Sequence, residues 1–234
     1  MRAVILAGGK GTRLRPYTTV LPKPLLPVGE KPILELVIRQ LARNGFDRID
    51  ISVGHLGQLI RTYFDQIELP EGIELDYHWE DQPLGTSGAL RHIEGLDDDF
   101  LAMNGDVLTT LDYSQLMRFH RSQDAALTIA THEKDVPISL GVIESDDGFV
   151  SDYIEKPTMH FEVSMGIYAY SPRALELIPE GYFDFPDLVK ALLAAGRKVA
   201  VYRAQARWFD IGTVEEHERA VEEIAANPEL FERG

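Results

Sequence analysis

The sequence predicts an α/β fold in which one domain is built around a doubly wound mixed sheet. Strand-like and helix-like segments alternate along about the first 135 residues, an order that typically gives a sheet covered by helices through right-handed crossovers. Hydrophobic residues make up 44% of the 234 residues, which is enough for a sizeable core. No linker rich in Pro, Gly or Ser divides the chain, so we expect one domain over residues 1–234.

The first half of the chain supplies the alternation. Residues 3–7 form an apolar run long enough for one buried strand. Residues 33–43 carry apolar side chains at helical spacing, and Asn44-Gly45 ends this expected helix. The other expected strands are 48–54, 73–80, 100–103 and 126–131, and the other expected helices are 58–64, 88–93 and 113–121.

The second half differs in character and indicates a sub-region of the same domain, beginning at about residue 136. Strands are expected at 141–144 and 150–155, joined by a hairpin turn at Asp146-Asp147-Gly148, and at 166–170. The elements expected after them are helices at 172–178 and 186–195, a strand at 198–203 and a helix at 214–226.

Composition argues against several classes of partner and site. The net charge of −15 argues against a nucleic-acid polymer as partner. No apolar run approaches membrane-spanning length and the N-terminus has no signal-peptide pattern, so we expect a cytoplasmic protein without a membrane partner. The chain contains no cysteine, which excludes disulfides, thiolate catalysis and Cys-based zinc sites.

Positive charge is concentrated at the N-terminus, where residues 1–31 carry a net +5 and leave −20 on the remainder. The strand expected at 3–7 is followed by Gly8, Gly9 and Gly11, whose backbone N–H groups can approach an anion closely. The cations that follow are Lys10, Arg13, Arg15 and Lys23. This pattern predicts a phosphate-binding turn, and the alternative is a glycine-rich surface turn with scattered basic residues.

The residues of this turn exclude two familiar phosphate motifs. A P-loop needs Ser or Thr after its Gly-Lys pair, whereas Gly11 follows Lys10. The dinucleotide-binding fingerprint needs a third glycine at the position where Leu14 stands. The chain also contains no Gly-x-Ser-x-Gly elbow and no cysteine nucleophile, so the sequence does not support a covalent enzyme intermediate.

A motif in two parts carries a family resemblance. It consists of Leu6-Ala7-Gly8-Gly9-x-Gly11-Thr12-Arg13-Leu14 followed by Leu21-Pro22-Lys23-Pro24, and it resembles the signature of the sugar-1-phosphate nucleotidyltransferases. The resemblance implies a Rossmann-like fold, the nucleotide-diphospho-sugar transferase fold, with a nucleotide-binding part over about 1–135 and a sugar-phosphate-binding part over about 136–234. Family members often carry a C-terminal β-helix, and we expect none here because the chain leaves no room for one.

The resemblance implies transfer of a nucleotidyl group from a nucleoside triphosphate to a sugar 1-phosphate, with release of pyrophosphate and a catalytic role for Arg13, Lys23 and Lys156. The positions that match its nucleotide-binding residues are Leu6, Ala7, Gly8, Gly9, Gly11, Thr12, Arg13, Gln82, Gly85 and Asn104. The positions that match its sugar-phosphate-binding residues are Gly141, Glu155, Lys156 and Ser164. Ser164 lies in a segment where the family commonly has Asn-Ala-Gly, which leaves the identity of the sugar open.

Two aspartates are candidate metal ligands. Asp106 follows an expected strand, at the edge of the sheet where ligands of α/β proteins bind, although Asn-Gly-Asp is also good turn chemistry. Asp210 lies between apolar neighbours, with helix capping as the plain alternative. In the resemblance both match the aspartates that hold the catalytic Mg²⁺, an ion that needs only one or two carboxylates. We interpret the competing Asp97-Asp98-Asp99 as a solvated acidic turn, because it precedes a strand.

The substrates are less sharply indicated than the family. Residues 80–90 resemble the base-recognition segment of the guanylyl-transferring branches, most closely mannose-1-phosphate guanylyltransferases, which implies GTP with mannose 1-phosphate or a related hexose or heptose 1-phosphate. Thymidylyl or uridylyl transfer to glucose 1-phosphate or an amino-sugar 1-phosphate stays open, as does a glycosyltransferase that consumes a nucleotide sugar. A non-catalytic regulatory homologue is a further alternative, and a homodimer is compatible with the sequence.

Overall fold

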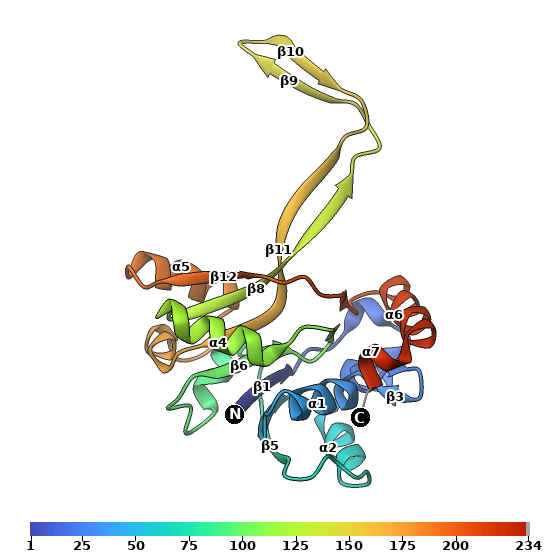
Figure 1. Ribbon diagram of the computed structural model, residues 1–234, viewed down its shortest axis with the longest axis vertical. Coiled ribbons are helices and arrows are strands. Elements are labelled where there is room, and N and C mark those ends of the chain that lie inside the picture. Colours follow the sequence, from blue (N-terminus) through green and yellow to red (C-terminus); the bar gives the residue numbers. More distant parts are fainter. Residues whose placement is uncertain (233–234) are drawn as a thin grey trace.

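The computed structural model describes residues 1–232, and a seven-stranded sheet runs through the middle of these residues (Figure 1). The strand order is β12-β8-β11-β6-β1-β4-β5. The strands are β1 (Arg2–Ala7), β4 (Arg48–Val53), β5 (Glu74–Trp79), β6 (Phe100–Asn104), β8 (Leu127–Pro137), β11 (Thr158–Tyr170) and β12 (Val199–Arg203). β1 is parallel to β4 and β6, whereas β11 is antiparallel to β6 and β8, so the predicted mixed sheet is confirmed.

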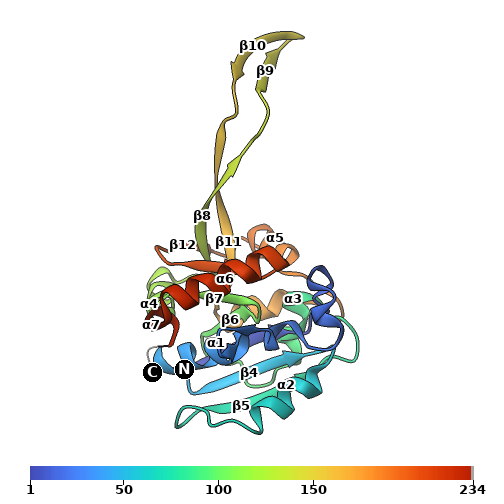
Figure 2. The same ribbon diagram turned by 90° about the vertical axis from the view of Figure 1, so that its right-hand side faces the viewer.

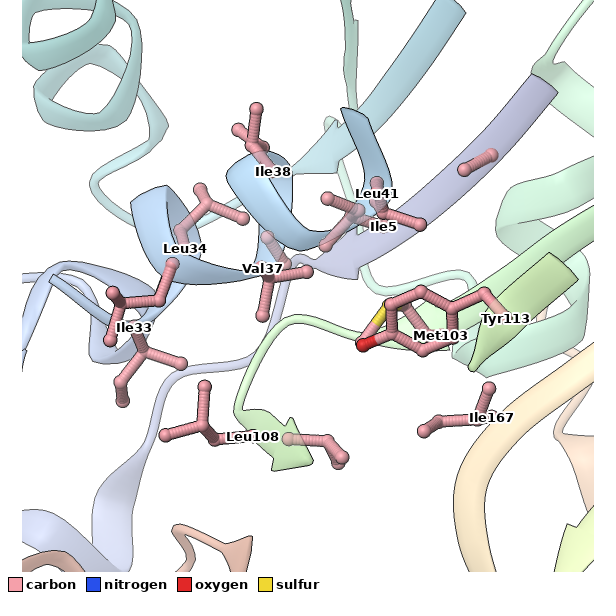
Figure 3. Packing of buried hydrophobic residues seen from close by; sticks show 14 of the residues in the cluster. Ile5, Ile33, Leu34, Val37, Ile38, Leu41, Met103, Leu108, Tyr113 and Ile167 are labelled. Carbon is pink, nitrogen blue, oxygen red and sulfur yellow. The ribbon is translucent and has the colours of Figure 1, made fainter. Parts of the chain in front are cut away.

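Helices cover both faces of this sheet (Figures 1 and 2). They are α1 (Ile33–Arg43), α2 (Gly57–Phe64), α3 (Gly85–Gly88), α4 (Tyr113–Gln123), α5 (Phe185–Ala194), α6 (Val214–Ala226) and α7 (Pro228–Glu232). Successive residues of a strand point to opposite faces, so Ile5 packs in the cluster formed with α1 while Val4 packs in the cluster formed with α5. Figure 3 shows Val37 and Leu41 of α1 close to Ile5. The central strand is therefore buried on both sides.

Most predicted elements are present, and two differ in type. α1 and α6 have the predicted bounds, whereas the helix expected at 88–93 consists of α3 and a following 3₁₀ turn (Ala89–His92). The helix expected at 172–178 is a 3₁₀ helix (Pro172–Leu177). Within residues 1–232, every helix is too short or too polar to span a lipid bilayer.

Two short strand pairs were not expected from the sequence. β7 (Val107–Thr109) pairs antiparallel with β13 (Trp208–Asp210), and β2 (Pro27–Val28) pairs with β3 (Lys31–Pro32). The first pair places Asp210 opposite Val107, and the backbone N–H of Ile211 donates to the carbonyl oxygen of Asp106 at 3.1 Å. This ladder joins segments about 100 residues apart in the chain.

A two-stranded arm projects from the sheet (Figures 1 and 2). β8 and β11 continue well beyond the strands expected at 126–131 and 166–170, and they lead into β9 (Val142–Asp146) and β10 (Phe149–Ile154) at the far end. We call residues 132–163 the arm. The strands expected at 141–144 and 150–155 are present, but the antiparallel β8–β11 ladder carries them away from the sheet.

Asp50 is fully buried in β4 and ties three neighbouring strands together. Its carboxylate accepts a hydrogen bond at 2.6 Å from Nε of Arg2 in β1, and it lies 2.8 Å from Nε2 of His78 in β5. Burial by itself raises the pKa of Asp50, but the hydrogen bonds from Arg2 and His78 outweigh burial, so that the pKa is lowered. The ionised carboxylate therefore stabilises the fold.

We expect Asp50→Ala to lower the free energy of unfolding by about 3 kcal/mol, because it removes the carboxylate partner of the partly buried Arg2 guanidinium. The depressed pKa of Asp50 predicts that this contribution is present above about pH 4 and is lost as the pH falls through the folded-state pKa. Urea unfolding of both proteins at several pH values measures the difference. Asp76→Ala is the control, because the exposed Asp76–Arg48 pair on the same strands is expected to contribute at most about 1 kcal/mol. An equal loss from both variants would contradict the assignment.

Candidate active site

A cleft of about 430 Å³ opens at the carboxyl ends of β1 and β6, the edge of an α/β sheet at which ligands bind. Its lining residues come from segments far apart in the chain. They include Leu6, Ala7, Gly8, Gly9, Gly11, Thr12, Arg13, Lys23, Glu80, Gly85, Thr86, Asn104, Asp106, Tyr182 and Asp184. All the predicted nucleotide-binding residues except Gln82 line this cleft.

The glycine turn forms one side of the cleft and is held in a fixed shape. Gly11 has φ = 58°, and a Cβ atom there would lie 2.9 Å from Cγ2 of Thr18, so a side chain is excluded both by conformation and by space. Thr18 Oγ1 also donates to the carbonyl oxygen of Gly11 at 2.7 Å. Arg13 follows in a 3₁₀ turn, and its guanidinium reaches toward Gly212 at the start of α6, where a Cβ atom would lie 3.2 Å from Nη2. The turn thus presents a cation to the cleft.

Asp106 and Asp210 lie together beside this turn, as the β7–β13 pair requires. Lys23 is a buried residue, only 8% exposed, and its ammonium group forms an ion pair with Oδ2 of Asp106. Oδ1 of Asp106 is buried and accepts no hydrogen bond from the described residues. Burial raises the pKa of Asp210, and the negative charge of Asp106 raises it further, against the opposing charges of Lys23 and Arg13.

This carboxylate pair fits a hard divalent cation. An unpaired carboxylate oxygen in a buried position is costly, and two neighbouring carboxylates repel each other unless positive charge lies between them. Mg²⁺ takes oxygen ligands and is commonly held by one or two carboxylates, with water and phosphate oxygens as the remaining ligands. Asp106 and Asp210 are therefore the residues that would hold such an ion.

The opposite side of the cleft is acidic. Gly85 has φ = 76°, and a Cβ atom there would lie 2.6 Å from the carbonyl oxygen of Phe183. Both the backbone conformation and the lack of space therefore favour glycine at this position. The next residue, Thr86, donates from its backbone N–H to Oδ1 of Asp184 at 3.0 Å. Tyr182 donates to the other oxygen of Asp184 and lines the cleft with it. This second glycine turn is thus anchored to the loop that precedes α5.

Glu80 is a cleft residue that the sequence did not single out. It directly follows β5, and its carboxylate accepts hydrogen bonds from Ser52 Oγ at 2.6 Å and from the backbone N–H of Leu84 at 3.3 Å. Gln82, which the resemblance places at the base, is exposed and does not line the cleft. The signal that singled out Asp106, an acid at the carboxyl end of an expected strand, applies equally to Glu80.

The structure separates the predicted sugar-phosphate-binding residues from one another. Ser164 lies where the arm joins the sheet, and its hydroxyl is 3.3 Å from the hydroxyl of Tyr168. Gly141 directly precedes β9, and Glu155 and Lys156 directly follow β10, and none of the three lines the cleft. Figure 1 shows β9 and β10 at the far end of the arm. Gly141 has a structural role as well, because the ring of Tyr153 fills the space that a Cβ atom would need.

The acidic run at 97–99 has a structural explanation. Asp99 lies 3.5 Å from the guanidinium of Arg121 in α4, and Asp97 and Asp98 are exposed. These three residues lie at the amino end of β6, on the opposite edge of the sheet from the cleft. This placement agrees with a solvated turn.

Comparison with known proteins identifies the family. The family model described as "Nucleotidyl transferase" matches residues 2–227. A UTP–glucose-1-phosphate uridylyltransferase of Synechocystis is 34% identical, over 94% of this chain and 62% of that protein. A mannose-1-phosphate guanylyltransferase of Mycobacterium tuberculosis is 32% identical, over 97% of this chain and 67% of that protein. The chain therefore spans about three-fifths to two-thirds of the length of these relatives.

Solved structures agree with the sequence comparison. The crystal structure of HddC from Yersinia pseudotuberculosis has a TM-score of 0.73 and 29% identity, and covers 95% of this chain and 99% of that one; a second structure of HddC is complexed with GMP-PN. A UDP-glucose pyrophosphorylase complexed with UDP-glucose, at 20% identity and a TM-score of 0.73, shares the fold. With its glycine turn, its cleft and its aspartate pair, the chain belongs to the nucleotidyl transferase family, among the sugar-1-phosphate nucleotidyltransferases.

Proposed function

We propose that this chain transfers a nucleotidyl group from a nucleoside triphosphate to a sugar 1-phosphate, giving a nucleotide sugar and pyrophosphate. The observation that carries this proposal is the position of the cationic glycine turn beside Asp106 and Asp210 in one cleft. A phosphate chain laid along the turn would meet Arg13, and beside it Lys23 together with the carboxylate pair to which Lys23 is bound. A bound Mg²⁺ would supply positive charge at the phosphate that is attacked.

The reaction requires positioning and charge neutralisation more than acid–base chemistry. A phosphate monoester has its second pKa near 6, so the sugar 1-phosphate is already mostly a dianion at pH 7 and needs no general base. One of its oxygens attacks the α-phosphorus in line, and the bond to the bridging oxygen breaks as pyrophosphate leaves with the electron pair. Arg13 and Lys23 would neutralise the departing pyrophosphate, while Lys156 would bind the attacking phosphate.

Glu80 supports guanine as the base. The carboxylate of Glu80 lies against Gly8 at the start of the cationic turn, so a nucleoside bound beside Gly8 would meet a group that can only accept hydrogen bonds. Guanine presents two adjacent N–H donors on its Watson–Crick edge. Uracil and thymine present one N–H between two carbonyl oxygens, which a carboxylate repels. We therefore propose GTP as the nucleotide, with mannose 1-phosphate or a related hexose or heptose 1-phosphate as acceptor.

The second candidate reaction is uridylyl transfer to glucose 1-phosphate. The similarity to the Synechocystis uridylyltransferase, at 34% identity, favours it. The similarity to the Mycobacterium tuberculosis guanylyltransferase and to HddC, with its GMP-PN complex, favours guanylyl transfer. Pyrophosphate release from each triphosphate with a panel of sugar 1-phosphates distinguishes the two reactions. It also distinguishes both from a glycosyltransferase, which would release no pyrophosphate.

We expect Arg13→Ala and Asp106→Asn each to lower the rate of pyrophosphate release by about 10²- to 10³-fold, because each removes charge stabilisation from the transition state. Circular dichroism verifies that both variants remain folded. The matched control is Arg15→Ala, which removes an exposed cation two residues from Arg13 that does not line the cleft. We expect this control to retain nearly the full rate. Near-normal turnover by Arg13→Ala would exclude the assigned role of that residue.

Glu80→Gln tests the choice of base. We expect the ratio of kcat/KM for GTP to kcat/KM for UTP to fall by about 10-fold or more, since a two-point contact to one base discriminates by about 1–3 kcal/mol. Gln82→Ala is the control, because Gln82 is two residues away and exposed. A change in base preference caused by Gln82→Ala and not by Glu80→Gln would restore Gln82 as the base-reading residue.

A further inference from the structure

The arm is an amphipathic ribbon with an uncovered apolar face. Residues directly opposite each other in an antiparallel pair lie on the same face. One face carries the opposed pairs His132–Val163, Lys134–Phe161 and Val136–Met159, and the other carries Glu133–Glu162, Asp135–His160 and Pro137–Thr158. Such alternation is typical of a sheet whose apolar side packs against another surface. Yet Phe161 is 49% exposed and Met159 is 41% exposed.

Exposed apolar side chains are concentrated on this arm. Of the 17 exposed large hydrophobic residues in the described part of the chain, nine lie on it: Val136, Leu140, Ile143, Phe149, Val150, Tyr153, Ile154, Met159 and Phe161. A two-stranded ribbon is at best marginally stable in water without a third layer. Exposed apolar side chains concentrated on one element in this way mark an interaction site. The arm therefore requires a partner surface.

The direction of the arm excludes its own body as that surface in this structure. β8 and β11 run from the sheet into the arm as continuous strands, and the arm extends away from the rest of the molecule in both views (Figures 1 and 2). About 15 residues on each side lie beyond the sheet, a reach of roughly 50 Å when fully extended. A second molecule can meet this surface without bending the ladder.

The charge of the arm matches a surface on the same chain. Residues 132–163 contain eight acids and two lysines, a net charge of −6. The glycine turn beside the cleft carries the exposed cations Lys10 and Arg13, and the exposed apolar residues Tyr17, Val20 and Leu21 follow it in the chain. An acidic, apolar arm is thus complementary to this basic, apolar segment. A two-fold axis would bring each arm to that segment of the other copy.

Lys156, on the arm, is a cation that could supply the positive charge that the cleft lacks. It follows β10 with φ = 46°, a left-handed conformation that is uncommon for a residue with a side chain and is often found at functional sites. Its ammonium lies 3.8 Å from exposed Glu155. Among the described residues that line the cleft, the cations are Arg13 and Lys23, and Lys23 is paired with Asp106. A triphosphate and a sugar phosphate together bring more negative charge than these two cations balance.

We propose that two copies of this chain exchange arms, so that Lys156 of each copy enters the cleft of the other and binds the attacking phosphate. This inference rests on the proposed function for the role of Lys156, whereas the arm exchange itself rests on the apolar face and the charge match. Each active site is then built from two chains.

Complementation between inactive variants tests the shared site. Lys156→Ala removes the arm residue, and Asp106→Asn disables the cleft. The two variants are co-expressed with different tags, and mixed dimers are isolated by sequential affinity purification. We expect each single variant to lose about 10²-fold or more in pyrophosphate release. We expect the mixed dimer, which has one intact cleft facing one intact arm, to recover about half of the wild-type rate per dimer. A mixed dimer as inactive as its parents would overturn the proposal, because Lys156 would then act within its own chain.

Sedimentation velocity tests the arm exchange without relying on catalysis. We expect the wild-type chain to sediment as a dimer and Phe161→Asp to sediment as a monomer. Thr158→Asp, on the polar face of the same strand and opposite Pro137, is the control and should remain dimeric. A monomeric wild type, or a dimer that survives Phe161→Asp, would overturn arm exchange. A dimer that releases no pyrophosphate from any triphosphate would instead contradict the proposed function and leave arm exchange supported.

Discussion

The approach of two carboxylates, Asp106 and Asp210, is the constraint on which the rest of the site depends. Like charges at close range in a partly buried place are unfavourable unless cations compensate them. Three separate segments meet to do so: the glycine turn with Arg13, the following loop with Lys23, and the short β7–β13 ladder that sets the spacing. The seven-stranded sheet serves this arrangement by placing the ends of β1 and β6 side by side.

The parts of the fold that depend on local signals could be predicted from the sequence. Apolar periodicity and the Asn44-Gly45 end signal gave the bounds of α1, and the predicted bounds of α6 also agree with the structure. Short apolar runs located β1 and β6, and the alternation of apolar and polar residues located β4. The parts that depend on partners distant in sequence could not. The length of β8 and β11 is set by their mutual pairing. The three-residue strands β7 and β13 are extended because they form hydrogen bonds with each other.

The same division holds for the site. The glycine turn and Asp106 follow directly from the rule that ligands bind where strands end, and the structure places both in the cleft. Glu80 obeys that rule too, but the family resemblance predicts Gln82 as the residue that binds the nucleotide. The positions of Gly141, Glu155 and Lys156 depend on where a long ribbon points, and no local pattern encodes that direction.

The β7–β13 ladder has a consequence for how the protein matures. Its two strands are separated by roughly a hundred residues, so loop-closure entropy must be overcome before they meet, and such non-local pairings form late in folding. Asp210 joins Asp106 only when that step is complete. The carboxylate pair is therefore completed only late in assembly: a chain emerging from the ribosome, or one truncated before Asp210, has the glycine turn but not the paired carboxylates beside it.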